Sequence, residues 1–256
     1  MASSGEQMTA VLLVGGLGTR LRSVVPTVPK PLASIGEKPF LELLLQQLQC
    51  QGVCRVVMCT GYRADDIAQE FGDGHERGMT IEYSPEPQPL GTAGAIRLAI
   101  AHLRGEPDFL VMNGDSFIEV DFDQLIRLHR TSGALLSMTV VRMKNEKRYG
   151  TVEVGDDGRV TGFLEKSSSS PVGFVNAGVY VFSRRVLDYI PEGSVSLEKD
   201  VLTQLLGGGV YALEQQGVFI DIGIPEDYAR AQGLCASLYE AALRKKHSGT
   251  GNRKTS

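Results

Sequence analysis

A glycine-rich segment near the start of the chain carries two separated cations. In VLLVGGLGTRLRSVVPTVPKPL, residues 11–32, three glycines follow a short apolar run, Arg20 comes next, and Lys30 stands between two prolines. Glycine backbone can approach phosphate oxygens closely, and an arginine and a lysine aimed at one anion would neutralise a polyphosphate. The segment alone is also compatible with a tight turn that bears two surface cations.

Two familiar phosphate-binding patterns do not fit this segment. A kinase-type loop needs a Gly-Lys pair followed by Ser or Thr, and the chain has none. The dinucleotide pattern G-x-G-x-x-G matches Gly16 and Gly18 but has Leu21 in place of its third glycine. The second predicted strand ends in CTG, residues 59–61, instead of an acidic residue that could hold a ribose. The sequence therefore disfavours a nicotinamide-binding site.

Two aspartates are placed where a ligand could meet them. Asp115 comes just after the apolar run DFLVMN, and Asp221 follows a second apolar stub 106 residues later. Open α/β sheets bind ligands at the carboxyl ends of their strands, although an aspartate after a strand is commonly a turn or cap residue. The four cysteines form no C-x-x-C pair and are expected to be buried reduced thiols, and the four histidines form no triad pattern.

Composition limits the class of protein. A chain of 256 residues with 42% hydrophobic and 22% charged residues can fill a sizeable core, so a disordered or fibrous protein is excluded. The net charge of −4 marks no nucleic-acid-binding surface. No apolar run reaches the roughly 18 residues that cross a bilayer, and MASSGEQM lacks the features of a signal peptide. We expect a cytoplasmic protein without nucleic-acid or membrane partners.

The elements that must position these residues alternate along the first half of the chain. Helical periodicity from Phe40 ends at Gly52, and further helices are expected to start near Ala64, Gly91 and Asp123. Strands separated by crossover helices predict an α/β fold with a parallel sheet. Short apolar runs predict strands at residues 9–14, 55–60, 80–84 and 108–113.

The pattern changes after about residue 134. Shorter alternating runs separated by turn signals predict antiparallel or mixed strands added to the parallel sheet. One last helix is expected from Pro225 to Leu243, followed by a flexible basic tail over 245–256. We predict a single domain over 8–244. The change of pattern divides the domain into residues 8–133 and 134–224.

The motifs occur in a family-specific order. The segment GGLGTRL with PKPL is followed by QPLGTAGAI (88–96), NGD (113–115), RYG (148–150), LEK (164–166), NAGVY (176–180) and FIDIG (219–223). This series resembles the sugar-1-phosphate nucleotidyltransferases from about Met8 to Gln232. The resemblance implies a Rossmann-like mixed, mainly parallel sheet with helices on both faces and a small antiparallel sugar-binding extension. It also implies transfer of a nucleotidyl group from a nucleoside triphosphate to a sugar 1-phosphate, with pyrophosphate released. By the same resemblance, the half over 8–133 would bind the nucleotide and the half over 134–224 the sugar phosphate.

The resemblance assigns catalytic roles to a few charged residues. Arg20 would act on the β and γ phosphates, Lys30 on the α-phosphate, and Lys166 on the phosphate of the incoming sugar. Asp115 and Asp221 would be ligands of Mg²⁺, the expected cofactor.

The other expected contacts divide into two groups. Residues matched to the nucleotide site are Leu13, Gly15, Gly16, Gly18, Thr19, Gln88, Leu90, Gly91, Thr92, Asn113 and Gly114. Residues matched to the sugar site are Tyr149, Gly150, Glu165, Lys166, Asn176 and Gly178.

The exact substrates stay open at this point. The ending FIDIGIPEDYARAQ resembles guanylyltransferases that act on D-glycero-α-D-manno-heptose 1-phosphate in bacterial polysaccharide pathways. Mannose-1-phosphate guanylyltransferases, and uridylyl- or cytidylyltransferases for hexose or muramic acid 1-phosphates, share the motifs. A catalytically silent regulatory subunit that binds sugar nucleotides is the alternative from another class, but such proteins usually lose a cation or metal ligand that this chain keeps. The sequence leaves homo-oligomerisation open.

Overall fold

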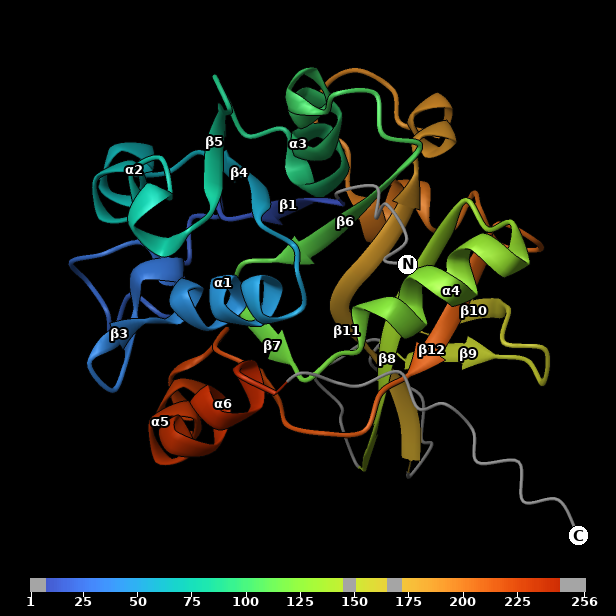
Figure 1. Cartoon of the computed structure of the whole chain (residues 1–256). Helices are drawn as coiled ribbons and strands as arrows, with labels where there is room; N and C mark the ends of the chain where they lie inside the picture. Colours follow the sequence, from blue (N-terminus) through green and yellow to red (C-terminus); the bar gives the residue numbers. More distant parts are fainter. Residues whose placement is uncertain (1–7, 145–150, 165–171, 245–256) are drawn as a thin grey trace, which may run out of the picture.

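Four parallel strands form the first half of a central sheet (Figure 1). The computed structural model describes residues 8–144, 151–164 and 172–244. Strand β1 (Thr9–Leu13) lies between β4 (Arg55–Thr60) and β6 (Asp108–Asn113), and β5 (Thr80–Pro85) pairs with the other edge of β4. All three pairings are parallel, as the apolar runs predict. Every residue of β4 is buried, which is typical of a strand covered on both faces.

Helices cover both faces of this sheet. The helices are α1 (Phe40–Cys50), α2 (Ala64–Phe71), α3 (Gly91–Ala99) and α4 (Phe122–Ser132). Side chains of α1, α2 and α4 pack in one apolar cluster with Leu12 of β1, whereas α3 packs in a second cluster with Val11. Neighbouring strand residues point to opposite faces, so β1 contributes to both clusters. The expected fold class is confirmed.

The second half of the chain adds antiparallel strands. The long strand β11 (Val172–Ser183) runs antiparallel to β6 and to β8 (Leu136–Lys144), and β12 (Val210–Glu214) pairs with the far edge of β8. The antiparallel hairpin β9 (Thr151–Val154) and β10 (Val160–Leu164) joins the start of β11. This hairpin is the small extension that the alternating runs predict.

Two short sheets lie beside the large one. Strand β7 (Ser116–Ile118) pairs with β13 (Phe219–Asp221), and β2 (Ser34–Ile35) pairs with β3 (Lys38–Pro39), both antiparallel. The pairing of β7 with β13 places Asp221 opposite Ser116, the residue that directly follows Asp115. The remaining short helices are η1 (Lys30–Leu32), η2 (His75–Arg77), η3 (Ile100–His102), η4 (Arg184–Tyr189) and the π-helical turn η5 (Leu197–Val201).

The structure corrects the expected single helix at the end of the chain. Helix α5 (Pro225–Gly233) ends at a glycine, and α6 (Cys235–Ala242) begins after Leu234, whose φ and ψ of −101° and 7° leave the helical region. The backbone N–H of Leu234 bonds the carbonyls of Arg230 and Ala231 and closes α5. Beyond the break, α6 packs against α1 and contributes Leu238 to the core.

Three of the four cysteines are less buried than expected. All four cysteines are free thiols, but only Cys59 is buried, so the expectation of four buried thiols is wrong for the other three. Cys50 is the last residue of α1, Cys54 directly precedes β4, and Cys235 is the first residue of α6; all three are partly exposed. Within the described ranges, no helix is long and apolar enough to cross a membrane.

Candidate active site

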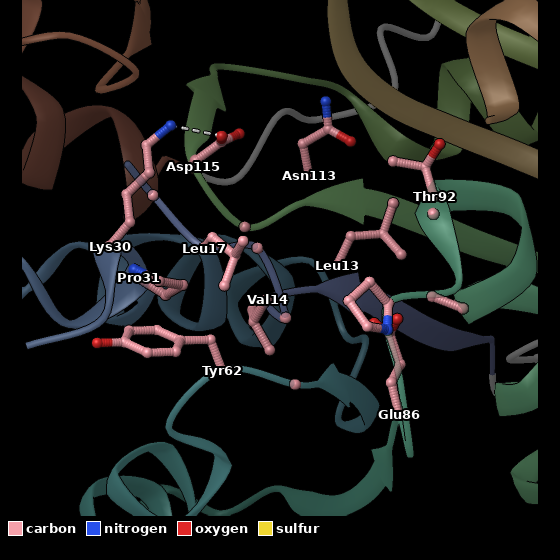
Figure 2. Close-up of a pocket in the computed structure, with 18 of the residues that line it drawn as sticks. Leu13, Val14, Leu17, Lys30, Pro31, Tyr62, Glu86, Thr92, Asn113 and Asp115 are labelled. Carbon is pink, nitrogen blue, oxygen red and sulfur yellow. Dashed lines mark hydrogen bonds and ion pairs between the residues drawn. The ribbon is translucent and has the colours of Figure 1, made fainter. Parts of the chain in front are cut away.

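A cavity of about 690 Å³ opens at the carboxyl ends of β1, β4 and β6 (Figure 2). Its wall contains most of the residues matched to the nucleotide site, and it continues to the cations and to Asp115. Because parallel strands end at the same sheet edge, loops that are distant in sequence meet there. The predicted residues that line it are Leu13, Gly15, Gly16, Gly18, Thr19, Arg20, Lys30, Gln88, Gly91, Thr92, Asn113, Gly114 and Asp115.

The glycine loop leaves the end of β1 and forms one side of the cavity. A Cβ at Gly18 would lie 3.1 Å from Lys30 Cβ, so the loop passes directly beside the segment that carries the lysine. Arg20 is exposed at the rim. Leu21, which replaces the third glycine of a dinucleotide pattern, is 1% exposed and anchors the loop in the core.

One lysine bridges the two aspartates. Lys30 Nζ lies 2.5 Å from Asp115 Oδ2 and 3.9 Å from Asp221 Oδ1, and the lysine side chain is only 8% exposed. Burial raises the pKa of Asp221, the nearby Asp115 carboxylate raises it further, and the charge of Lys30 opposes both effects. The N–H of Gly223 donates to Asp221 Oδ1 at 2.6 Å, and the N–H of Ile222 donates to the Asp115 carbonyl at 3.0 Å. The structure thus joins both carboxylates at one cationic point.

The far end of the cavity carries an acidic side chain. Glu86 follows β5, is half-buried, and accepts a hydrogen bond on Oε2 from the N–H of Leu90 at 2.8 Å. Burial raises the pKa of Glu86, and the Leu90 N–H partly opposes that rise. Leu90 itself does not line the cavity, so its part here is to orient Glu86. In Figure 2, Glu86 and the Lys30–Asp115 pair lie at opposite ends of the site.

A segment from the second half of the chain closes the site near α3. The carbonyl of Val195 accepts from the N–H groups of Ala93 and Gly94 at 3.0 and 3.3 Å. Thr92 Oγ1 accepts from the N–H of Leu197 at 2.7 Å and donates to Glu198 Oε2 at 3.2 Å. Thr92 is therefore held in place by residues that follow β11 by more than ten positions.

The two described residues of the sugar group lie on a bulge of β11. The register against β8 shifts between Asn176 and Tyr180, and Gly178 inside the bulge has φ of +77°. Asn176 accepts from the N–H of Gly178 at 3.0 Å and donates to Tyr180 Oη at 2.7 Å. A Cβ at Gly178 would lie 2.7 Å from Asn113 Nδ2, so the bulge touches the cavity wall without lining it.

Four expected residues of the sugar group cannot be placed. Tyr149, Gly150, Glu165 and Lys166 lie outside the described residues. Their roles stay predictions.

The chain matches a known family over nearly its whole length. The family model described as Nucleotidyl transferase matches residues 9–237. The chain belongs to this family. The match confirms the resemblance that the ordered motifs indicate.

Three relatives of this nucleotidyltransferase show how near the likeness is. The chain is 40% identical over 227 residues to D-glycero-alpha-D-manno-heptose 1-phosphate guanylyltransferase of Aneurinibacillus thermoaerophilus. The alignment covers 88% of this chain and 97% of that protein. The chain is also 39% identical over 229 residues to mannose-1-phosphate guanylyltransferase of Mycobacterium tuberculosis, covering 88% of this chain and 64% of that longer protein. HddC from Yersinia pseudotuberculosis, crystallised with GMP-PN, has a TM-score of 0.79 and 34% identity, with 88% of this chain and 98% of that chain covered.

Sequence reasoning missed several residues of the nucleotidyltransferase cavity. Glu86 follows β5 at the same sheet edge as Asp115, so the rule that identified Asp115 would have identified it too. Tyr62 and Gly61 follow β4 at that edge as well. Glu198 has no such signal, because it comes from the distant turn η5. The further lining residues are Val14, Leu17, Pro31, Pro87, Pro89, Ala95 and Gly223.

Proposed function

We propose that this chain transfers a guanylyl group from GTP to D-glycero-α-D-manno-heptose 1-phosphate, which gives GDP-heptose and pyrophosphate. One observation carries the proposal: a single cavity is lined by Lys30 and Asp115 at one end, with Asp221 Oδ1 3.9 Å from Lys30 Nζ, and by the carboxylate of Glu86 at the other end. The heptose product would serve bacterial polysaccharide synthesis in the cytoplasm.

Glu86 supports guanine as the base. A carboxylate only accepts hydrogen bonds, and guanine presents two adjacent donors, its N1–H and its N2 amino group. Uracil and thymine instead present one N–H between two carbonyl oxygens, which a carboxylate would repel. The Leu90 N–H holds Oε2 of Glu86 and so fixes the orientation of the carboxylate. HddC, with 34% identity, was crystallised with the guanine nucleotide GMP-PN.

The sugar assignment rests on relatives. The heptose 1-phosphate guanylyltransferase is 40% identical, and the alignment covers 97% of it. Mannose 1-phosphate is the second candidate acceptor, because the mycobacterial mannose-1-phosphate guanylyltransferase is 39% identical. Both acceptors carry hydroxyl groups that Asn176 and the expected Tyr149 and Glu165 would bind.

Catalysis in this proposal is the positioning of anions. An oxygen of the sugar 1-phosphate attacks the α-phosphorus of GTP in line and forms a new P–O bond. The bond from the α-phosphorus to the oxygen bridging to the β-phosphate breaks, and pyrophosphate leaves with that electron pair. Lys30 stabilises charge at the α-phosphate and Arg20 at the leaving pyrophosphate. Lys166 is assigned to the phosphate of the acceptor.

Asp115 and Asp221 fit a magnesium site. Both face Lys30 Nζ, so their oxygens converge on one point, and Mg²⁺ commonly takes one or two carboxylates beside substrate phosphates. When bound, Mg²⁺ would withdraw charge from the phosphoryl oxygens. With the two carboxylates holding the ion, the ammonium group of Lys30 would be available to bind the α-phosphate.

The deciding experiment measures pyrophosphate release from the purified protein. Each of four nucleoside triphosphates is paired with heptose 1-phosphate, mannose 1-phosphate and glucose 1-phosphate, with and without MgCl₂. We expect the highest kcat/KM with GTP and the heptose. If no pair of substrates gives pyrophosphate release, the proposed transferase activity is wrong. A preference for UTP or CTP would overturn the guanylyl assignment, and a preference for mannose 1-phosphate would select the second candidate acceptor.

A further inference from the structure

The glycine-loop segment, residues 15–29, has little burial of its own. Leu17 is 53% exposed and Val24 is 49% exposed, whereas Leu21 is 1% exposed. Turn hydrogen bonds of 2.9–3.0 Å run from the N–H groups of Val24 and Val25 back to the Leu21 carbonyl. These contacts order the middle of the segment. They do not fix its two ends over the cavity, because a loop with few buried side chains opens easily.

Both ends of the segment are held by the loop between β4 and α2. At the first end, the N–H of Tyr62 donates to the Gly15 carbonyl at 3.3 Å, and a Cβ at Gly61 would lie 2.9 Å from that same oxygen. The guanidinium of Arg22 stacks over the Tyr62 ring at 4.7 Å. At the second end, Arg63 Nη1 donates to the Thr27 carbonyl.

Arg63 occupies an unfavourable backbone conformation. Its φ of 54° and ψ of 45° lie in the left-handed region, and it is the one non-glycine residue with positive φ in the part of the chain described. This conformation costs free energy at any side chain with a Cβ, so a glycine or asparagine would be the ordinary choice. An ion pair with Asp66 holds the Arg63 guanidinium in place. An arginine thus stands where the backbone disfavours it, and its long side chain reaches the glycine-loop segment.

We propose that Arg63 is a positioning residue that holds the glycine-loop segment closed over the nucleotide triphosphate. The inference rests on the proposed function, since it assigns the segment to GTP. With Thr27 tied to Arg63 and Gly15 tied to Tyr62, the stretch that carries Gly18 and Arg20 is ordered before the nucleotide arrives. A loop ordered in advance loses less entropy on binding, so the contact favours nucleotide affinity.

The test compares Arg63→Asn with an exposed control, Arg127→Asn in α4. Asparagine tolerates left-handed backbone but is too short to reach Thr27, so the melting temperature of Arg63→Asn should equal or exceed that of the wild type. Amide hydrogen exchange of residues 16–28 in the ligand-free protein should be at least about tenfold faster in Arg63→Asn, a difference of about 1.4 kcal/mol in opening free energy. Arg127→Asn should change neither quantity.

Kinetics supply the second readout. Arg63→Asn should raise KM for GTP about tenfold while KM for the sugar 1-phosphate stays within twofold. Asp66→Asn, which frees the guanidinium, should give a smaller change in the same direction. Unchanged exchange in Arg63→Asn would overturn the proposal, as would equal rises of both KM values. If the wild-type protein has no transferase activity but amide exchange is still faster in Arg63→Asn, then Arg63 holds the glycine-loop segment and the proposed function is wrong.

Discussion

Lys30 Nζ lies 2.5 Å from Asp115 Oδ2 and 3.9 Å from Asp221 Oδ1, so one ammonium group neutralises two carboxylates that belong to distant parts of the chain. The lysine side chain is 8% exposed, whereas that of Asp115 is 42% exposed. A divalent cation and Lys30 would compete for the same carboxylate oxygens.

Replacing Lys30 should make the protein more responsive to magnesium. Lys30→Met leaves two facing carboxylates without their counter-ion, and we expect a loss of about 1 kcal/mol in stability, since water screens the exposed partner. Saturating MgCl₂ should restore it, so the magnesium-induced rise in melting temperature is larger in Lys30→Met than in wild type. Thermal melts with and without MgCl₂ measure this. Lys199→Met, at an exposed position, is the control, and an equal magnesium response in all three proteins would contradict the prediction.

Neutralising either aspartate should remove activity and keep the fold. Asp115→Asn and Asp221→Asn conserve size but delete a negative charge, so we expect kcat to fall at least about 100-fold, or about 2.7 kcal/mol in barrier. The measurement is pyrophosphate release, with circular dichroism to check folding. Asp123→Asn, at an exposed position in the first turn of α4, should keep wild-type rates. A fully active Asp115→Asn protein would refute the assignment.

Glu86→Gln should weaken selection of guanine. The amide presents only one acceptor oxygen and no charge, so KM for GTP should rise roughly 10- to 100-fold, or about 1.4–2.7 kcal/mol. KM for UTP should fall or stay constant, because a repulsive carboxylate is gone. Steady-state kinetics with both nucleotides decide the matter. A parallel rise for GTP and UTP would show that Glu86 supports the loop and does not read the base.

Gly178 and Gly133 form a matched pair for testing the bulge. Both have positive φ, at 77° and 64°, but a Cβ would meet Asn113 Nδ2 and Ser116 Oγ at 2.7 Å only at Gly178. Gly133→Ala should therefore cost about 1 kcal/mol from backbone strain alone. Gly178→Ala should cost about 3 kcal/mol or more and lower activity by displacing Asn113. Chemical denaturation gives both values, and equal losses would contradict the packing at the bulge.

His129 should make the fold less stable in acid. The ring is 2% exposed and lies 3.1 Å from Ser137 Oγ through Nδ1 and 3.5 Å from Asp108 Oδ1 through Nε2. Burial lowers the pKa of His129, and Asp108 only partly opposes this. The unfolded chain therefore takes up a proton first as pH falls below about 6.5, and the free energy of unfolding decreases until the lowered folded pKa is reached.

The variant His129→Gln isolates that effect. Glutamine keeps a hydrogen-bonding group beside Ser137 but does not titrate, so the free energy of unfolding should change less between pH 7.5 and 5.5 than in wild type. Denaturant titrations at several pH values across that window give the two slopes. Equal slopes would show that His129 does not contribute to acid sensitivity.

The sequence was sufficient for the parallel half of the fold and for much of the candidate site. Short, near-continuous apolar runs are typical of buried strands, and strands joined by crossover helices are typically parallel. Parallel strands end at one edge, so Gly16, Asn113 and Asp115 had to meet there. These inferences depend on the local pattern of apolar and polar residues, which can be read directly from neighbouring positions in the sequence.

Tertiary structure alone decided the relations between distant segments. The pairing of β7 with β13 brings Asp221 to Lys30, the turn η5 brings Glu198 to Thr92, and the guanidinium of Arg63 reaches the Thr27 carbonyl. The packing of α6 against α1 beyond the break at Leu234 is a further such relation. Such contacts join residues from tens to more than a hundred positions apart, so no short-range periodicity in the sequence can predict them. Their geometry comes from burial and hydrogen bonding in the complete fold, which also determines the pKa of Asp221 and Glu86.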